Sequence, residues 1–394
     1  MRIVWIALAL VISGAAGVFG FIYWPRQMRI TLPSGMPEVL AEDSAPVISF
    51  PNRALVGQLA KFDDDLFAYL MFDHYRSLGV LSDKQVMLTS REQNGRPVYY
   101  ILLRLPNDTL EGAALLENLQ ASGLTAALDY NWVAESEMVR DLKQTRLFLD
   151  AYAGPVNQSL DDLHPDELKN YLRRFIRFKS MTDPRVRSGE GLVPSPLTRT
   201  QATRLAADII AVSKFYDIPI DLFLGVGAME NDYMNVPGDL DHAIWKRRPD
   251  PGDIVLERKR RRVLVVDYAS GVWQITRHSL RYAHSLYLHD KRDYSELPER
   301  LRPPKRLDVN DVAPETLTTY AGLLLRDLLD RFQGDVAKAV GAYNGGVRNP
   351  NLKYAAGVEI VASYARRVIA RAAALNRVAV SKVQFEDETD GEKE

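Results

Sequence analysis

The strongest hydrophobic pattern beyond the N-terminus runs from Ile218 to Asp232, where apolar residues occupy most faces of a predicted helix. A helix that is apolar all round is usually buried inside a larger protein. Asp217 is suited to cap its start, and Pro219 fits its first turn, where no intrahelical N–H partner is needed. Gly225 and Gly227 each weaken a helix by roughly 1 kcal/mol relative to Ala. We therefore expect close packing, or a ligand, at the face that carries these two glycines.

Periodic apolar positions predict a helical C-terminal half around this segment. Gly334 is expected to end one of its helices and Asp335 to cap the next. In the last helix the expected core face includes Ile360 and Tyr364. In chain order, the predicted helices on either side of the central one are 200–216, 271–287, 315–332, 335–346 and 360–372.

Two short runs, 253–257 and 262–268, predict a minor hairpin within this helical half. Its tip lies in a run of five consecutive basic residues, Arg258 to Arg262. Such a run is most often a solvated turn. The alternative is a surface that attracts an anionic polymer or lipid headgroups.

The pattern between residues 53 and 195 mixes helical and strand periods and predicts an α+β and helical region. Asn94 and Gly95 give a turn signal between two of its strands. The expected core positions of its later helices are Leu142, Leu147, Leu149, Tyr152, Leu168, Tyr171, Leu172 and Phe175. The region contains no catalytic constellation, and its role stays unassigned. Its predicted elements are a helix over 61–75, strands over 86–89 and 98–105, a helix over 110–120, a third strand over 124–130 and helices over 135–180.

Residues Ile3 to Trp24 contain no charge, and about 20 apolar residues are enough to cross a bilayer core. The small residues Ser13 to Ala16 would suit a cleavable signal peptide, but the aromatic residues at the far end favour an uncleaved anchor. The predicted organisation is an anchor or signal over 1–27, a linker over 28–52, the α+β and helical region over 53–195, a helical domain over 200–376 and an acidic tail over 377–394.

Composition narrows the chemistry. The net charge of −1 gives no reason to expect nucleic acid as a partner. The chain has no Cys, which excludes disulfides and thiolate metal sites. The six His residues show no ligand spacing; His284 and His289, for example, are five apart in or near a predicted surface helix. We therefore expect neither a metal ion nor an organic cofactor.

The central helix ends with one carboxylate, Glu230, against apolar residues, which raise the pKa of a carboxyl group and suit it to act as a general acid. A surface Glu on a fraying last turn is the alternative. Three motifs follow in order: Gly-Val-Trp-Gln at 271–274, Ala-Tyr-Asn-Gly-Gly at 342–346 and Tyr-Ala-Arg-Arg-Val at 364–368. Together with Glu230 they resemble the lytic transglycosylases of the goose-type-lysozyme-like fold, over about residues 203–375.

The resemblance implies a mainly α protein: a lysozyme-like helical catalytic domain with a small β-hairpin, acting on peptidoglycan. Glu230 would protonate the glycosidic oxygen between N-acetylmuramic acid and N-acetylglucosamine. As a carboxylate it would then accept the proton of the muramoyl 6-hydroxyl, leaving a 1,6-anhydro end. Tyr364 would orient Glu230. The implied substrate-binding residues are Gln274, Tyr343, Asn344, Tyr364, Asn231 and Trp273.

Five of these residues also have a structural interpretation. Gln274 could cap its helix, and Tyr343 and Asn344 could be turn residues with a core ring. Tyr364 lies on an apolar face, and Trp273 is more often a core residue than a sugar platform. The structural and the substrate-binding interpretations both stay open at this point.

Three features depart from the family pattern, two residues and one spacing. Asn231 stands where Ser usually follows the catalytic Glu, and Trp273 stands where Met is common. Forty residues separate Glu230 from Gly271, far more than the usual spacing. This insert, which includes the basic hairpin, puts substrate preference in doubt more than chemistry.

Two other functions compete with this interpretation. A hydrolytic muramidase on the same fold would need a second carboxylate, such as Asp239, Asp241 or Asp267. A wall-binding or scaffold protein would bind glycan without cutting it. The expected partners are peptidoglycan strands and the bacterial inner membrane, crossed once, with the catalytic domain on the periplasmic or extracytoplasmic side.

Overall fold

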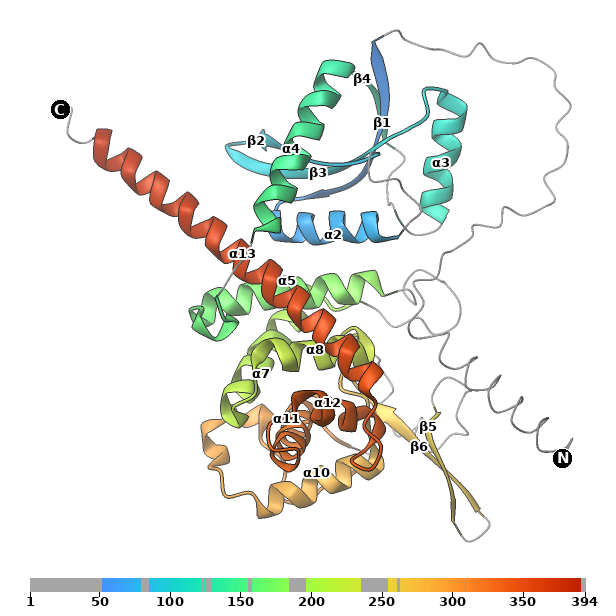
Figure 1. The fold of residues 1–394 in the computed structure, drawn as a ribbon, viewed down its shortest axis with the longest axis vertical. Helices are drawn as coiled ribbons and strands as arrows, with labels where there is room; N and C mark the ends of the chain where they lie inside the picture. The colour runs from blue at the N-terminus through green and yellow to red at the C-terminus, as the bar shows by residue number, and fades with distance from the viewer. Residues whose placement is uncertain are drawn as a thin grey trace, which may run out of the picture. The chain divides into compact units, whose positions relative to one another are not determined.

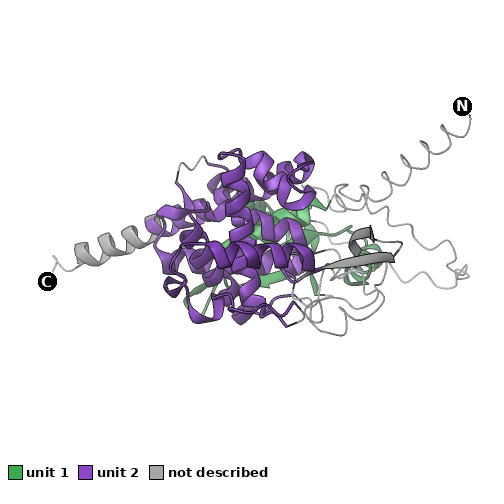
Figure 2. Ribbon diagram, turned by 90° about the horizontal axis from the view of Figure 1, so that it is seen from below, with its two compact units in different colours: residues 1–145 green, residues 146–394 purple. Residues whose placement is uncertain are grey.

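The computed structural model divides the chain into two compact units, residues 1–145 and 146–394 (Figures 1 and 2). The described part is mainly helical and contains small antiparallel sheets, as the sequence predicted. The described residues are 52–78, 85–121, 124, 129–154, 158–183, 196–234, 254–260, 263–309 and 311–390.

Unit 1 is built on a four-stranded antiparallel sheet with the spatial order β2-β3-β1-β4. In chain order the elements alternate as β-α-β-β-α-β. In the sheet, β3 lies between β1 and β2, which is the split β-α-β arrangement. The elements are β1 (Arg53–Phe62), α2 (Asp65–Ser77), β2 (Val86–Gln93), β3 (Arg96–Arg104), α3 (Thr109–Ala121) and β4 (Tyr130–Ala134).

The turn between β2 and β3 confirms the Asn-Gly signal. Asn94 and Gly95 have φ values of 53° and 72°, the left-handed conformation that a two-residue hairpin loop of type I′ requires. The first strand, by contrast, was not predicted. The helical prediction began at Lys61, but this residue lies in β1 and the helix starts after Asp64, whose side chain caps it by accepting from Phe67 N–H. The third predicted strand, 124–130, is also displaced, since β4 begins at Tyr130.

The two faces of this sheet pack differently. On one face α3 approaches so closely that a Cβ on Gly57 would lie 2.9 Å from a methyl of Leu116. The other face carries a cluster that includes Val56, Leu102 and Met138, the last from α4 (Glu135–Ala153). The sheet is therefore enclosed by helices from both sides, with α4 covering part of the second face.

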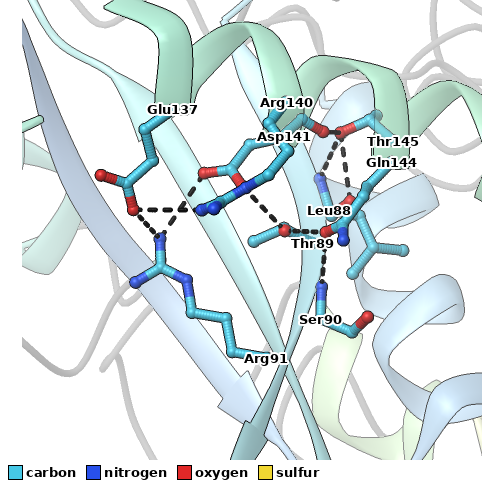
Figure 3. A network of polar contacts seen from close by, with 9 residues as sticks. All are labelled: Leu88, Thr89, Ser90, Arg91, Glu137, Arg140, Asp141, Gln144 and Thr145. Atoms are coloured by element: carbon cyan, nitrogen blue, oxygen red, sulfur yellow. Dashed lines mark hydrogen bonds and ion pairs between the residues drawn. The ribbon is translucent and has the colours of Figure 1, made fainter. Parts of the chain in front are cut away.

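Helix α4 also protects the free edge of β2 (Figure 3). Leu88 N–H donates to Thr145 Oγ1 at 2.9 Å, and Ser90 N–H donates to Gln144 Oε1 at 3.1 Å. These amides would otherwise be unpaired on an edge strand, where they invite association with another chain. The buried carboxylate of Asp141 accepts from Thr89 Oγ1 at 3.0 Å.

This polar contact explains why part of the predicted core of α4 was wrong, although Tyr152 is 1% exposed and buried as predicted. Leu142 and Leu147 are 36% and 68% exposed. The helix instead turns polar side chains toward β2, because they can accept hydrogen bonds and leucines cannot. Thr145 and Gln144 accept from edge amides of the strand, and Asp141 accepts from the Thr89 hydroxyl. Leu149 is only partly buried.

Unit 2 is a helical assembly. Gly334, at φ 84°, follows the end of α11, and the side chain of Asp335 caps α12 by accepting from Lys338 N–H, as predicted. The helices are α5 (Pro165–Thr182), α7 (Arg199–Tyr216), α8 (Ile220–Asn231), α10 (Arg277–His289), α11 (Pro314–Arg331), α12 (Val336–Gly345) and α13 (Leu352–Asp390). The strands are β5 (Ile254–Arg260), β6 (Val263–Ser270) and β7 (Ile275–Thr276), with 3₁₀ turns η1 (Leu160–Asp162), η2 (Tyr294–Glu296) and η3 (Glu299–Leu301).

The predicted central helix, α8, is buried over most of its length and packs along α13. A Cβ on Gly225 would lie 2.8 Å from the carbonyl oxygen of Val358, and one on Gly227 would lie 2.6 Å from the ring of Tyr233. Both glycines therefore serve close packing within the protein. The predicted cap was wrong: Asp217, at φ 53°, ends α7, and α8 has no side-chain cap.

Helix α13 is longer than the sequence suggested. It continues to Asp390, beyond the predicted domain end at residue 376, and residues 377–390 contain no Pro or Gly that would end it before Gly391. Ile360, an expected core residue, is 70% exposed. Helix α5, which the sequence grouped with the N-terminal region, packs on α13, where Asn376 Nδ2 donates to Tyr171 Oη at 2.7 Å.

The predicted anchor, 3–24, and the linker up to residue 51 lie outside the described residues. Within the described ranges, none of the helices combines the length and the hydropathy that a membrane crossing requires.

Candidate functional site

Glu230 occupies the last turn of α8, and the helix ends one residue later, at Asn231. Asp232 and Tyr233 both adopt left-handed backbone conformations, with φ values of 47° and 55°. Tyr233 is fully buried beneath Gly227, and its hydroxyl donates to the carbonyl oxygen of Leu224. The end of α8 is thus fixed by a ring packed under its own helix.

The carboxyl group of Glu230 has the properties of a proton donor at neutral pH. Burial raises its pKa from the ordinary value of 4.5 to about 7, and a hydrogen bond from Tyr354 acts in the opposite direction. Tyr354 Oη donates to Glu230 Oε1 at 2.6 Å. Although protein atoms desolvate the carboxyl group, the residue keeps part of its surface accessible, which a group that must reach a substrate needs.

The tyrosine that contacts Glu230 is not the one the resemblance implied. Tyr364 lies ten residues further along α13, about 15 Å at 1.5 Å per residue. Its ring packs against Phe175 at 6.3 Å between centroids. The predicted role of Tyr364 is therefore wrong, and Tyr354 is the residue that sequence reasoning missed.

A signal for Tyr354 was present in the sequence. Positions 354, 358, 362, 365 and 369 form one buried stripe with helical spacing. Val358 and Ala362 on this stripe are the residues that face Gly225 of α8. A tyrosine at the start of the same stripe lies nearest to the end of α8, whereas Tyr364 lies beside the stripe.

The second motif forms the turn between β6 and β7. Gly271 and Gln274 are both left-handed, at φ 66° and 47°. Gln274 Nε2 donates to the carbonyl oxygen of Gly271 at 2.8 Å, and Asn231 Nδ2 approaches the same oxygen at 3.5 Å. The turn is therefore tied to the end of α8, and in this structure the amide of Gln274 is engaged by its own turn.

Trp273 is a core residue, so its predicted contact with glycan is wrong. Its side chain is 1% exposed and stacks on Phe223, with 4.2 Å between centroids and 10° between planes. Its Nε1–H donates to Thr318 Oγ1 at 3.0 Å. A ring buried among these partners has no face left for a sugar.

The third motif ends α12 next to the same group. Tyr343 Oη donates to the carbonyl oxygen of Trp273 at 3.1 Å, and burial together with the charge of Glu230 raises the pKa of Tyr343 well above its usual value. Asn344 is exposed, and its Oδ1 accepts from Asn351 Nδ2 at 2.9 Å.

Four segments thus meet at Glu230: the end of α8, the 271–274 turn, the end of α12 and the start of α13. Within the described residues, burial and Tyr354 are the causes of the pKa shift of Glu230, and no second carboxylate contributes to it. Asp239 and Asp241 lie outside those residues, and Asp267 lies in β6, opposite Leu256.

The carboxylate of Asp232 forms an ion pair with another residue and not with the Glu230 site. Its Oδ1 pairs with Lys179 Nζ at 2.8 Å. Among the residues that the structure describes, no three His, Asp or Glu side chains gather closely enough to hold a metal ion.

No family model, curated protein or solved structure gives a significant match to this chain. The resemblance to lytic transglycosylases therefore depends on the motif residues themselves and on their geometry around Glu230.

Proposed function

We propose that this protein is a peptidoglycan lytic transglycosylase with a lysozyme-like catalytic domain and Glu230 as its single acid–base group. The observation that carries the proposal is a carboxyl group with a pKa of about 7 at the end of a buried helix, where the ordered motifs converge. A fraying surface glutamate would have neither the burial nor the partner.

The reaction follows from the two states of this group. Protonated Glu230 donates to the glycosidic oxygen between N-acetylmuramic acid and N-acetylglucosamine, and the bond from that oxygen to C1 breaks. The resulting carboxylate takes the proton of the muramoyl 6-hydroxyl, and this oxygen closes onto C1. The products are a 1,6-anhydromuramoyl end and a free 4-hydroxyl, and Glu230 is again protonated.

One carboxylate is enough for this route. Most glycosidases need two, because one must activate water or act as nucleophile. An intramolecular hydroxyl is already positioned, so the group that protonated the leaving oxygen can accept the second proton. The pKa of Glu230, close to neutral, suits both directions of transfer.

The remaining parts of the proposal come from the sequence. The uncharged segment Ile3 to Trp24 would hold the protein in the bacterial inner membrane, with unit 2 on the periplasmic or extracytoplasmic side. Peptidoglycan strands are the substrate, and no metal or cofactor is needed.

The products identify the reaction. Purified sacculi incubated with the full-length protein should release soluble fragments with anhydromuramoyl ends, which mass spectrometry finds one water lighter than reducing ends. Glu230→Gln should release roughly 10²- to 10⁴-fold less of them. Ordinary reducing ends would establish a hydrolase with a second carboxylate in the insert. Sedimentation with sacculi and no products from the wild type would establish a binding protein.

The two tyrosines of α13 give a matched pair of variants. Tyr354→Phe should shift the alkaline limb of the kcat/KM–pH profile above pH 7, because the hydroxyl stabilises the carboxylate and its loss raises the pKa of Glu230. The maximal rate should fall about tenfold, since the carboxyl group loses its orienting hydrogen bond. Tyr364→Phe should leave both the limb and the rate in place. A shifted limb and a lower rate in Tyr364→Phe, with neither change in Tyr354→Phe, would instead support Tyr364 as the residue that orients Glu230.

A further inference from the structure

An open pocket of about 300 Å³ lies on the sheet of unit 1, on the face that carries Met138. Its floor is apolar and comes from three strands: Val56 of β1, Leu102 of β3 and Val133 of β4. Val56 and Leu102 are each 7% exposed and Val133 is half-buried, so a ligand would touch this floor through the small part that α4 leaves open. The volume is at the lower end of the range for small-ligand sites.

The rim of the pocket is polar and has hydrogen-bonding capacity to spare. It includes the side chains of Gln58, Asp129 and Asn131. Within the described residues, none of these three side chains makes a hydrogen bond or an ion pair. Two amides and one carboxylate therefore face the pocket with donors and acceptors available to a ligand.

The charge at the rim does not favour an anion. Arg91 lines the pocket, but its guanidinium pairs with Glu137 at 3.2 Å and Asp141 at 3.5 Å (Figure 3). Asp129 adds a further negative charge. A phosphate or a carboxylate would gain little here, so the pocket suits a neutral, polar ligand.

The position of the pocket also argues against an extended peptide. Peptides that add to a sheet pair with the main chain of an edge strand. This pocket lies over the face of the sheet formed by β1, β3 and the edge strand β4, and the side chains of a strand point out of the plane of the sheet, away from its main-chain edge. Its contacts are side chains and apolar carbons.

An amino sugar matches these features. Its hydroxyl and acetamido groups both donate and accept, as the rim amides of Gln58 and Asn131 do. Its C–H faces and acetyl methyl can pack on the apolar floor and on the ring of Tyr130, which is 40% exposed beside the pocket.

We propose that this pocket binds N-acetylated amino sugars of a glycan strand, as a second glycan site in a different unit from Glu230. Its preference for a neutral, polar ligand follows from the pocket alone. The choice of an N-acetylated glycan rests on the proposed function. The site would hold a strand without cutting it, because the one carboxylate of its lining, Asp129, is exposed to solvent and lacks the apolar enclosure that surrounds Glu230.

The experiment uses the full-length Glu230→Gln protein, which binds without cutting, and the N-acetylglucosamine tetramer as probe. Hydrogen exchange should slow in residues 129–134 when the tetramer is added. Asn131→Ala and Tyr130→Ala, on the same background, should each abolish this protection and weaken binding at this site about tenfold. Asn107→Ala, an exposed amide of unit 1 outside the pocket, should change neither.

Protection that appears only around Glu230, or pocket variants that bind as the parent does, would overturn the second site. Protection of 129–134 by a free stem tetrapeptide and not by the tetramer would assign the pocket to peptide instead. The two proposals fail separately. Loss of pocket binding in Asn131→Ala beside a wild type that makes no anhydromuramoyl ends would keep the glycan site and reject the transglycosylase.

Discussion

Replacement of Glu230 by Gln is expected to reduce glycan cleavage by roughly 10²- to 10⁴-fold, the usual contribution of a positioned acid–base group. The amide keeps the size of the side chain and can still accept from Tyr354, so binding to sacculi should persist. Turnover measured by release of soluble fragments tests this. Glu359→Gln, an exposed position on α13, is the matched control and should keep full activity.

The same substitution should stabilise the protein at alkaline pH. The folded-state pKa of Glu230 is raised, so its contribution to stability is fully present below pH 4.5 and is lost as pH rises through about 7. Gln has no charge to bury. Above pH 7, therefore, the variant should unfold with a free energy larger by roughly 3 kcal/mol, the equivalent of the pKa shift. Denaturant titration at pH 5 and pH 8.5 measures it. An equal stability difference at both values would contradict a neutral, buried Glu230.

The second large effect is on folding. Gly225→Ala should lower the free energy of unfolding by about 2–4 kcal/mol, as overpacking of a helix interface does. This is opposite in sign to helix propensity, which favours Ala over Gly by roughly 1 kcal/mol. The new methyl group would lie 2.8 Å from the carbonyl oxygen of Val358, a backbone atom that cannot rotate away. Thermal or denaturant unfolding gives the answer.

A second substitution shows which neighbour causes the loss. Ala362→Gly removes the methyl group that the new Cβ would meet at 3.1 Å, but it leaves the carbonyl of Val358 in place. The double variant should therefore recover only a small part of the stability. Full recovery would place the conflict at Ala362 and would leave room between the backbones of α8 and α13.

Sequence reasoning located the elements whose signals are local. The apolar run of α8, the Asn94-Gly95 turn and the Gly334-Asp335 boundary all depend on neighbours within a few residues, and the structure confirms them. Glu230 could be predicted as the candidate acid for the same reason, since consecutive residues show that it lies at the end of an apolar helix.

What the sequence missed depends on contacts between distant segments. The strand β1 contains Ala, Gly and Lys, which have low strand propensity, and it forms because β3 and β4 pair with it on both sides. Both Tyr354 and Tyr364 fit a helix with a buried face, and only the packing of α8 on α13 selects Tyr354. The apolar character of Trp273 suits a sugar and a core equally, and Phe223 decides between them.

The contacts that end α8 make the position of Glu230 independent of the chain that follows Met234. The hydroxyl of Tyr233 donates to the carbonyl oxygen of Leu224, and the Asn231 amide approaches the carbonyl oxygen of Gly271. The two ends of the segment between Met234 and Gly271 are therefore held close together. A segment inserted between these points can change in length or sequence without transmitting strain to the carboxyl group. We therefore expect the chain between Met234 and Gly271 to tolerate exchange or engineering while the carboxyl group of Glu230 keeps its position, because Asn231 and Tyr233 lie outside that segment.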